Sequence, residues 1–102
     1  MVNMMKLMKQ AQAMQSNMQK LQSELAERTY DFSAGGGVVK AVAKGDMTIV
    51  SLTVDPKAVD PQDVEMLQDL VISAVNGALK LARDSASAEM GKLTGGLGIP
   101  GL

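Results

Sequence analysis

The sequence contains no cysteine, no histidine and no tryptophan, and its only aromatic residues are Tyr30 and Phe32. Without cysteine there is no disulfide framework, thiol nucleophile or thiolate metal site, and nothing indicates an oxidising compartment. Without histidine the usual proton shuttle near neutral pH is missing, together with Ser-His-Asp and His-metal chemistry. These absences exclude most enzyme mechanisms. We therefore expect a non-enzymatic protein with no metal and no cofactor.

The sequence also lacks long apolar runs. None approaches the ~20 residues of a membrane span, and the N-terminal apolar residues are interrupted by Lys6, Lys9 and Gln10, which is not the pattern of a signal peptide. We expect a cytoplasmic protein that does not act at a membrane.

What the chain has is aliphatic and sulfur-containing side chains. Its 102 residues fit one domain, and 46% of them are apolar, including nine methionines. A domain of this size buries only about two thirds of the surface that its unfolded chain exposes. The core is therefore expected to be thin and built from Met, Leu, Val and Ala.

Charge is unevenly distributed along the chain. The net charge is −1, which by itself argues against a strong nucleic-acid binder. However, no acidic side chain precedes Glu24, whereas Lys6, Lys9 and Lys20 do, and from Ser51 onward seven acids face four bases. The chain is electrically polarised, with its basic part at the N-terminus.

The N-terminal segment carries an apolar heptad seam. Its spacing alternates three and four residues up to Leu25, and Asn3 is a plausible N-cap, which predicts a helix from about Met4 to Glu27. Such a helix is ~36 Å long, whereas strands of about seven residues reach ~23 Å. Part of the seam overhangs the sheet, so we expect a homodimer. The expected interface residues are Met4, Leu7, Ala11, Met14, Met18 and Leu21.

A different arrangement would also cover this seam. If the second helix folded back on the first, the two would form a helical hairpin within one chain. Oligomeric state in solution distinguishes the two arrangements.

The middle of the chain predicts strands. Thr29, Tyr30 and Phe32 indicate a short strand, and the segments 38–43 and 47–54 read as a hairpin joined by Lys44-Gly45-Asp46, where the glycine can supply a positive φ. In the last strand apolar and hydroxyl residues alternate, so one face should be buried. The residues expected on that face are Val50, Leu52 and Val54.

A second long helix and a tail complete the chain. Asp60 is the expected N-cap, Pro61 the first helical residue and Asp63 a first-turn acid, with Gly77 as a weak point and an end near Met90. We expect residues 1–90 to form the single domain and residues 91–102, with five glycines and a proline, to form a flexible tail.

Two motifs suggest binding sites but have simpler explanations. The run Ser33 to Gly37 lacks the Gly-Lys-Ser/Thr of a phosphate loop and leads into a strand, so it is expected to be a loop or bulge that needs unusual backbone angles. The four carboxylates Asp55, Asp60, Asp63 and Glu65 do not have EF-hand spacing, and capping and turn formation explain them.

Lys6 and Lys9 lie one helical turn apart on the face opposite the heptad seam, near the positive end of the helix dipole. On one chain this is typical of a solvated face. In a dimer the basic ends occur twice, and paired basic arms on a rigid support can straddle a duplex.

Several segments together resemble a known family. They are 4–12 (MMKLMKQAQ), 34–40 (AGGGVVK), 60–70 (DPQDVEMLQDL), Asn76 and 90–102 (MGKLTGGLGIPGL). These segments span the chain from end to end. They resemble the bacterial YbaB/EbfC family of nucleoid-associated proteins.

The resemblance implies an α+β fold of two layers, α-β-β-β-α, with a three-stranded antiparallel sheet and long terminal helices. It implies a tight homodimer whose helical ends protrude like tweezers and bind duplex DNA in the bacterial nucleoid, with roles in nucleoid organisation and gene regulation. The residues expected to contact DNA are Lys6, Lys9, Lys20, Lys80, Arg83 and Lys92.

The sequence departs from the family's usual pattern in two places. Ala41 and Ala43 stand where larger β-branched residues are expected, and the end of the second helix is poor in charge. The competing hypothesis is a helical adaptor for replication or recombination proteins that uses the methionine-rich end and the Gly-Leu-Ile-Pro tail.

Overall fold

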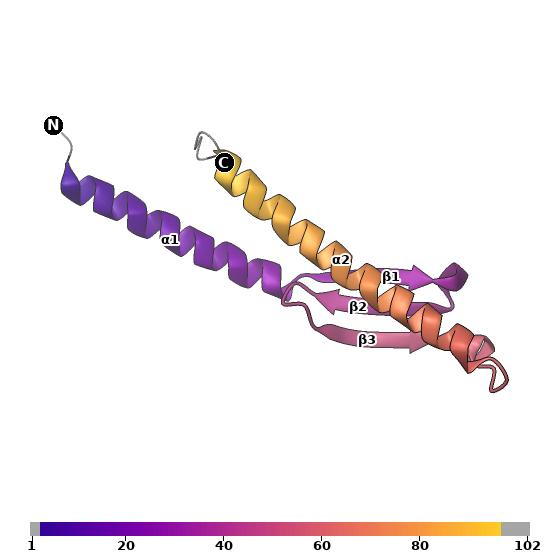
Figure 1. Ribbon diagram of the computed structural model, residues 1–102. Helices are drawn as coiled ribbons and strands as arrows, with labels where there is room; N and C mark the ends of the chain where they lie inside the picture. The colour runs from indigo at the N-terminus through magenta and orange to yellow at the C-terminus, as the bar shows by residue number, and fades with distance from the viewer. Residues whose placement is uncertain (1–2, 97–102) are drawn as a thin grey trace.

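A computed structural model describes residues 3–96, and their side chains as far as Lys92. The elements are α1 (Met4–Glu27), β1 (Thr29–Ala34), β2 (Val39–Lys44), β3 (Ile49–Val54) and α2 (Val64–Gly96), with 3₁₀ turns η1 (Gly35–Gly37) and η2 (Pro56–Ala58). The strands form one antiparallel sheet in the order β1-β2-β3, and α2 crosses one face of it (Figure 1). The α+β class and the α-β-β-β-α order expected from the sequence are confirmed.

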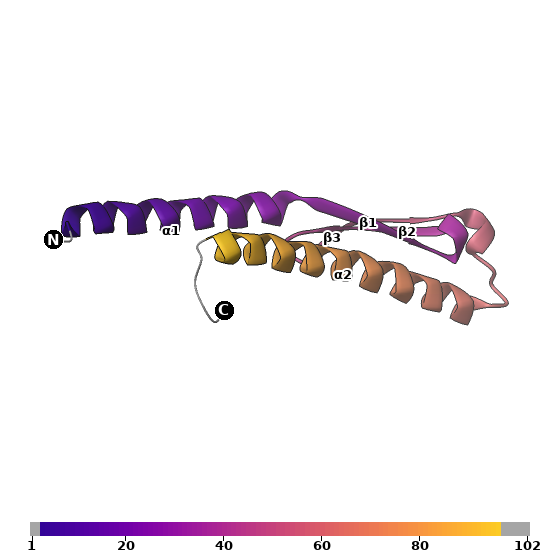
Figure 2. The ribbon, with the colours of Figure 1, turned by 90° about the horizontal axis from the view of Figure 1, so that it is seen from above.

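Helix α1 projects away from the sheet (Figures 1 and 2). The Asn3 side chain accepts hydrogen bonds from the backbone N–H groups of Met5 and Lys6, at 3.0 and 3.4 Å, so the expected N-cap and helix bounds are confirmed. The helical-hairpin alternative is wrong, because α1 does not pack along α2. Its heptad seam is left open: Met4 is 69% exposed and Leu7 47%.

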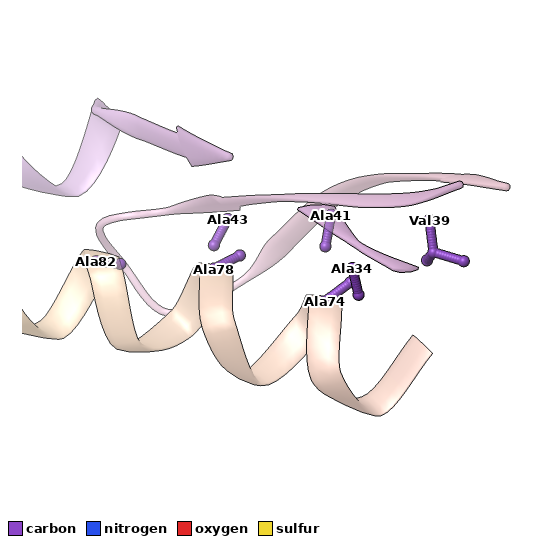
Figure 3. Close-up of a cluster of buried hydrophobic side chains, with 7 residues drawn as sticks. All are labelled: Ala34, Val39, Ala41, Ala43, Ala74, Ala78 and Ala82. Atoms are coloured by element: carbon purple, nitrogen blue, oxygen red, sulfur yellow. The ribbon is translucent and has the colours of Figure 1, made fainter. Parts of the chain in front are cut away.

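The core between α2 and the sheet consists of small side chains. Figure 3 shows alanines of the helix pointing at alanines of β1 and β2. Because alanine has no side chain beyond Cβ, the helix lies close to the strands, which explains why Ala41 and Ala43 replace larger residues here. The buried cluster comprises Ala34, Val39, Ala41, Ala43, Ala74, Ala78 and Ala82.

Strand β3 lies outside this core. Helix α2 packs on β1 and β2 and leaves β3 largely uncovered, so Val50 is 50% exposed and Leu52 is 44% exposed. The expectation that Val50 and Leu52 are buried is therefore wrong for a single chain; Val54, at the end of the strand, is half-buried.

The hairpin loop between β2 and β3 differs from expectation in its backbone. The positive φ belongs to Met47, at 68°, and not to Gly45. Asp46 stabilises this turn because its carboxylate accepts hydrogen bonds from the backbone N–H and the hydroxyl of Thr48. The hydroxyl bond is the main reason that the pKa of Asp46 lies below its ordinary value.

Helix α2 starts later than expected. Asp60 accepts a hydrogen bond from the N–H of Gln62 at 2.9 Å and so belongs to a turn. The N-cap contact comes from Asp63, whose carboxylate accepts from the N–H of Met66 at 3.2 Å. The prediction of Asp60 as N-cap and Pro61 as first helical residue is wrong, because the Asp-Pro-Gln-Asp segment closes a separate turn before the helix.

The other end of α2 also differs. The helix continues to Gly96, so the predicted end near Met90 is wrong. Gly91 does not end the helix, because glycine weakens a helix without preventing it. The rest of the predicted tail, residues 97–102, lies outside the described residues.

The acidic residues of the loops cap and turn the backbone. Asp55 accepts from the N–H of Lys57 at 3.0 Å, as Asp60 and Asp63 do from their own neighbours. Within residues 3–96, no group of three acidic side chains is placed to hold a metal ion, and no helix is long and apolar enough to cross a membrane.

Candidate nucleic-acid interface

The three lysines of α1 share one face of the helix. At 100° per residue, Lys9 and Lys20 both lie within about 60° of Lys6, whereas the heptad seam is centred on the far side. All three are exposed, and none makes an ion pair with a described carboxylate. Along the axis, Lys20 lies ~21 Å from Lys6. The positive charge of this face is therefore available to an external anion.

The bases of α2 are less available. Lys80 is paired with Asp84 at 2.7 Å, and Lys92 with Glu89 at 3.6 Å. Arg83 is exposed and makes no ion pair with a described carboxylate. Of the predicted DNA-contacting residues of this helix, only Arg83 thus presents an unneutralised charge.

The six predicted DNA-contacting residues do not form one cluster. Lys80 and Arg83 lie where α2 crosses the sheet, because their neighbours Ala78 and Ala82 contact β2 and β1. The C-terminal part of α2, which contains Lys92, extends beyond the sheet on the side to which α1 projects (Figures 1 and 2). Within one chain the structure places the three lysines of α1 on one face of that helix and Lys80 beside Arg83 on α2, and it does not join these two groups.

The sequence analysis did not include Arg28 among the basic residues of the site. Arg28 links α1 to β1, and its guanidinium lies 3.8 Å from the same Glu89 carboxylate that contacts Lys92. A single carboxylate therefore holds two bases from separate elements. No local sequence signal relates Arg28 to Glu89, because the contact depends on the path of α2 past the start of β1.

An apolar corner between β3 and α2 was also missed. In the β2–β3 register Leu52 is opposite Ala41, so both point toward the helix side of the sheet. On α2, Gly77 faces Phe32 of β1. The opposite flank therefore faces β3. It lines an open pocket of about 380 Å³ with Leu67, Gln68, Val71 and Ile72.

Known proteins resemble this chain in both sequence and fold. A family model described as the YbaB/EbfC DNA-binding family matches residues 1–97. The chain belongs to the YbaB/EbfC DNA-binding family. Within this family, a protein named "Nucleoid-associated protein" from Desulforamulus reducens is 61% identical over 100 residues, covering 98% of this chain and 95% of its relative. A protein of the same name from Pelotomaculum thermopropionicum is 59% identical over 100 residues, again covering 98% of this chain and 95% of its relative.

A solved structure supports the fold independently. The crystal structure of uncharacterized protein HP0035 from Helicobacter pylori superposes with a TM-score of 0.75, covering 92% of this chain and 99% of that one, at 19% sequence identity. The resemblance read from the sequence is confirmed: this is a member of a nucleoid-associated, DNA-binding family, which is not an enzyme family.

Proposed function

We propose that the protein is a homodimer that binds duplex DNA mainly through phosphate contacts, and that it acts in nucleoid organisation and gene regulation. The observation that carries the proposal is the face of α1 with Lys6, Lys9 and Lys20, none of which is ion-paired with a described carboxylate. Most protein–DNA hydrogen bonds go to phosphates and sugars, and such contacts carry little sequence information. Modest sequence preference is therefore expected.

Dimerisation is supported by how much apolar surface one chain leaves open. The largest fully buried side chain is Val39, whereas Leu7, Met14, Leu52 and Ile72 are all exposed. Each large apolar side chain that a partner covers contributes roughly 1.5 to 3 kcal/mol. A second copy is the partner that is always present when the chain is made.

Two surfaces are available for that second copy. One is the α1 seam proposed as the interface from the sequence: Met4, Leu7, Ala11, Met14, Met18 and Leu21. The other is the apolar corner, defined here as the helix-side face of β3 with the adjoining flank of α2. Strand β3 is an edge strand with no charged residue between Ile49 and Val54, so it lacks the usual protection of an exposed edge. It can meet its own copy across a two-fold axis without opposing like charges.

The doubled α1 arms then present the lysine face twice. If about four to six phosphates are neutralised, two or three per arm, the net charge of −1 per chain does not prevent binding. Five of the eleven acidic residues lie in the loops after β3 and in the first turns of α2, at the end of the molecule from which α1 points away (Figure 1).

Substitution of the arm lysines tests the phosphate model. The double variant Lys6→Ala/Lys9→Ala should lose at least about tenfold in affinity for a short duplex near 100 mM salt, with a shallower salt dependence, because up to four phosphate contacts per dimer are removed. Fluorescence anisotropy measures both quantities.

The matched control is Lys57→Ala, which removes an exposed lysine in η2 at the other end of the molecule. The DNA affinity of this variant should stay within about twofold of wild type. A basic side chain remote from the DNA adds only a long-range attraction, which salt screens. Equal losses in the control and the arm variant would contradict the assignment to α1.

The adaptor hypothesis makes the opposite prediction. A chain that recruits replication or recombination proteins through its tail would keep its partner when Lys6 and Lys9 are replaced and lose it when residues 97–102 are deleted. Deletion of the tail without loss of DNA affinity, combined with the arm result above, supports the DNA-binding function.

A further inference from the structure

Helix α1 meets the rest of its chain at one joint. Leu25, at 6% exposure, is its only buried residue, and the helix ends two residues later. Beyond this last turn α1 extends free of the sheet (Figure 2). Within the chain, the direction of the whole arm is therefore decided by the contacts around Leu25.

Gly45, in the β2–β3 loop, fills this joint. Its backbone N–H donates a hydrogen bond to the carbonyl oxygen of Arg28 at 2.9 Å. A Cβ at this position would lie 1.7 Å from the carbonyl oxygen of Leu25 and 2.7 Å from the carbonyl carbon. Both obstacles are backbone atoms, so no side-chain rotation relieves the overlap.

The reason for glycine here is space and not backbone conformation. Gly45 is not among the residues with positive φ, unlike Gly35, Gly36 and Gly37. An alanine at position 45 could adopt the backbone angles but would force the loop and the last turn of α1 apart.

Polar contacts surround the same joint. Lys44 lies 3.2 Å from the carboxylate of Glu27, and Arg28 lies 3.8 Å from that of Glu89. Two residues after Arg28, the Tyr30 hydroxyl donates to Ser85 at 2.9 Å. Exposed ion pairs add little stability. Their geometry nonetheless connects the base of α1 to the loop on one side and to α2 on the other.

We propose that Gly45 is a positioning residue: by allowing the β2–β3 loop to touch the backbone of the last turn of α1, it sets the direction of the basic arm. Lys6 lies ~28 Å from Leu25 along the helix. A tilt of about 15° at the joint moves Lys6 by ~7 Å, which equals the rise of about two base pairs along the DNA axis. The expected effect of this displacement on DNA binding rests on the proposed function. The geometry of the joint is independent of that function.

The absence of native cysteine allows the arm direction to be measured with spin labels. Gln12→Cys labels α1, and Thr53→Cys labels the sheet face away from α2; both positions are exposed. Labelled chains diluted with unlabelled ones give intrachain distances by pulsed electron paramagnetic resonance. Gly45→Ala should shift the mean distance by about 5 Å or more, as expected for a tilted helix of this length.

Gly91→Ala is the matched control, because a Cβ at Gly91 meets nothing within 4 Å. It should leave the distance unchanged. A Gly45→Ala distance distribution that coincides with wild type would overturn the proposal.

DNA affinity separates this proposal from the proposed function. A shifted distance with roughly tenfold weaker DNA binding supports both, since misplaced lysines lose phosphate contacts. A shifted distance with wild-type affinity supports the joint and contradicts the role of α1 in DNA binding.

If Gly45→Ala does not fold, Leu25→Ala provides the second test. Removing the only buried side chain of α1 loosens the joint without a clash. The distance distribution should broaden around the wild-type mean, and a distribution as narrow as that of wild type would overturn the proposal.

Discussion

At the scale of single residues, Glu89 pairs with two basic residues, and under the proposed function it would oppose DNA binding. Its carboxylate lies within 4 Å of both Arg28 and Lys92, at the start of β1, where α2 leaves the sheet. A phosphate that approaches these bases must displace a carboxylate already present. The contact is half-exposed, so it adds little to the stability of the fold. It nonetheless competes with any phosphate for Arg28 and Lys92.

Glu89→Gln should therefore strengthen DNA binding by about two- to fivefold at low salt, because two bases become free for phosphates. The control is Asp31→Asn, which frees Lys40 on the sheet from a comparable exposed ion pair at 3.4 Å. Anisotropy titrations with the same duplex compare the two variants. The same affinity for both would mean that Arg28 and Lys92 do not approach DNA.

The sequence predicted single residues well where the cause is local. The Asn3 cap and the lysine face of α1 follow from neighbours in the sequence. Leu52 was wrongly predicted to be buried. The alternation of apolar and polar residues along a strand does not reveal how far a helix covers the sheet. The contact of Arg28 with Glu89 and the fit of Gly45 against Leu25 depend on elements that meet far apart in the chain.

At the scale of elements, the packing of α2 depends on small residues along one side. The alanines that face β2 permit a close approach, and Gly77 leaves room for the ring of Phe32. The sequence suggested that Gly77 only weakens the helix. A Cβ at this position would lie 2.2 to 2.5 Å from the Phe32 ring, so the glycine has a packing role.

Gly77→Ala and Gly91→Ala test this role as a pair within one helix. Gly91→Ala should stabilise the protein by about 0.5 to 1 kcal/mol through helix propensity alone. Gly77→Ala should instead destabilise it by about 1 to 3 kcal/mol, because the overlap with Phe32 outweighs the propensity gain. Urea unfolding at one fixed protein concentration measures both values. Equal stabilisation by both substitutions would contradict the packing role.

The bounds of α1 and the three strands were predictable because heptad spacing, β-branched residues and glycine runs mark them directly. The ends of α2 were not. Asp-Pro begins both helices and turns, and only the hydrogen bond to Asp63 shows which occurs here. Glycine in the last turns was taken as a stop, although the helix continues to Gly96.

At the scale of the whole molecule, the chain is thin and long, with extents of 76 × 25 × 16 Å. A layer of this thickness cannot enclose large side chains, so the buried cluster is mostly alanine and most of the described methionines stay exposed. Shape and composition together favour obligate association, in which folding and dimerisation are one process.

The apolar corner and the α1 seam are the two interfaces suggested for the proposed dimer, and single substitutions test them separately. Leu52→Glu should weaken the dimer by at least about 100-fold, because a two-fold interface would bury two unpaired carboxylates. Thr53→Glu, on the other face of the same strand, should leave the dimer intact. Leu7→Glu, near the free end of α1, should have a smaller effect than Leu52→Glu.

Size-exclusion chromatography with light scattering over a dilution series measures these effects. A Leu52→Glu dimer as stable as wild type would exclude the apolar corner as the main interface. A wild-type chain that is a monomer of unchanged helicity on dilution would contradict the homodimer altogether.

The most direct measurement for the whole proposal is the affinity of the wild-type protein for duplex DNA at several salt concentrations. Contacts with about four to six phosphates should lower the affinity by ~10²- to 10³-fold between about 50 and 200 mM salt, with a linear dependence of log affinity on log salt. An affinity that is indifferent to salt over this range would contradict binding through phosphates by the lysine face of α1.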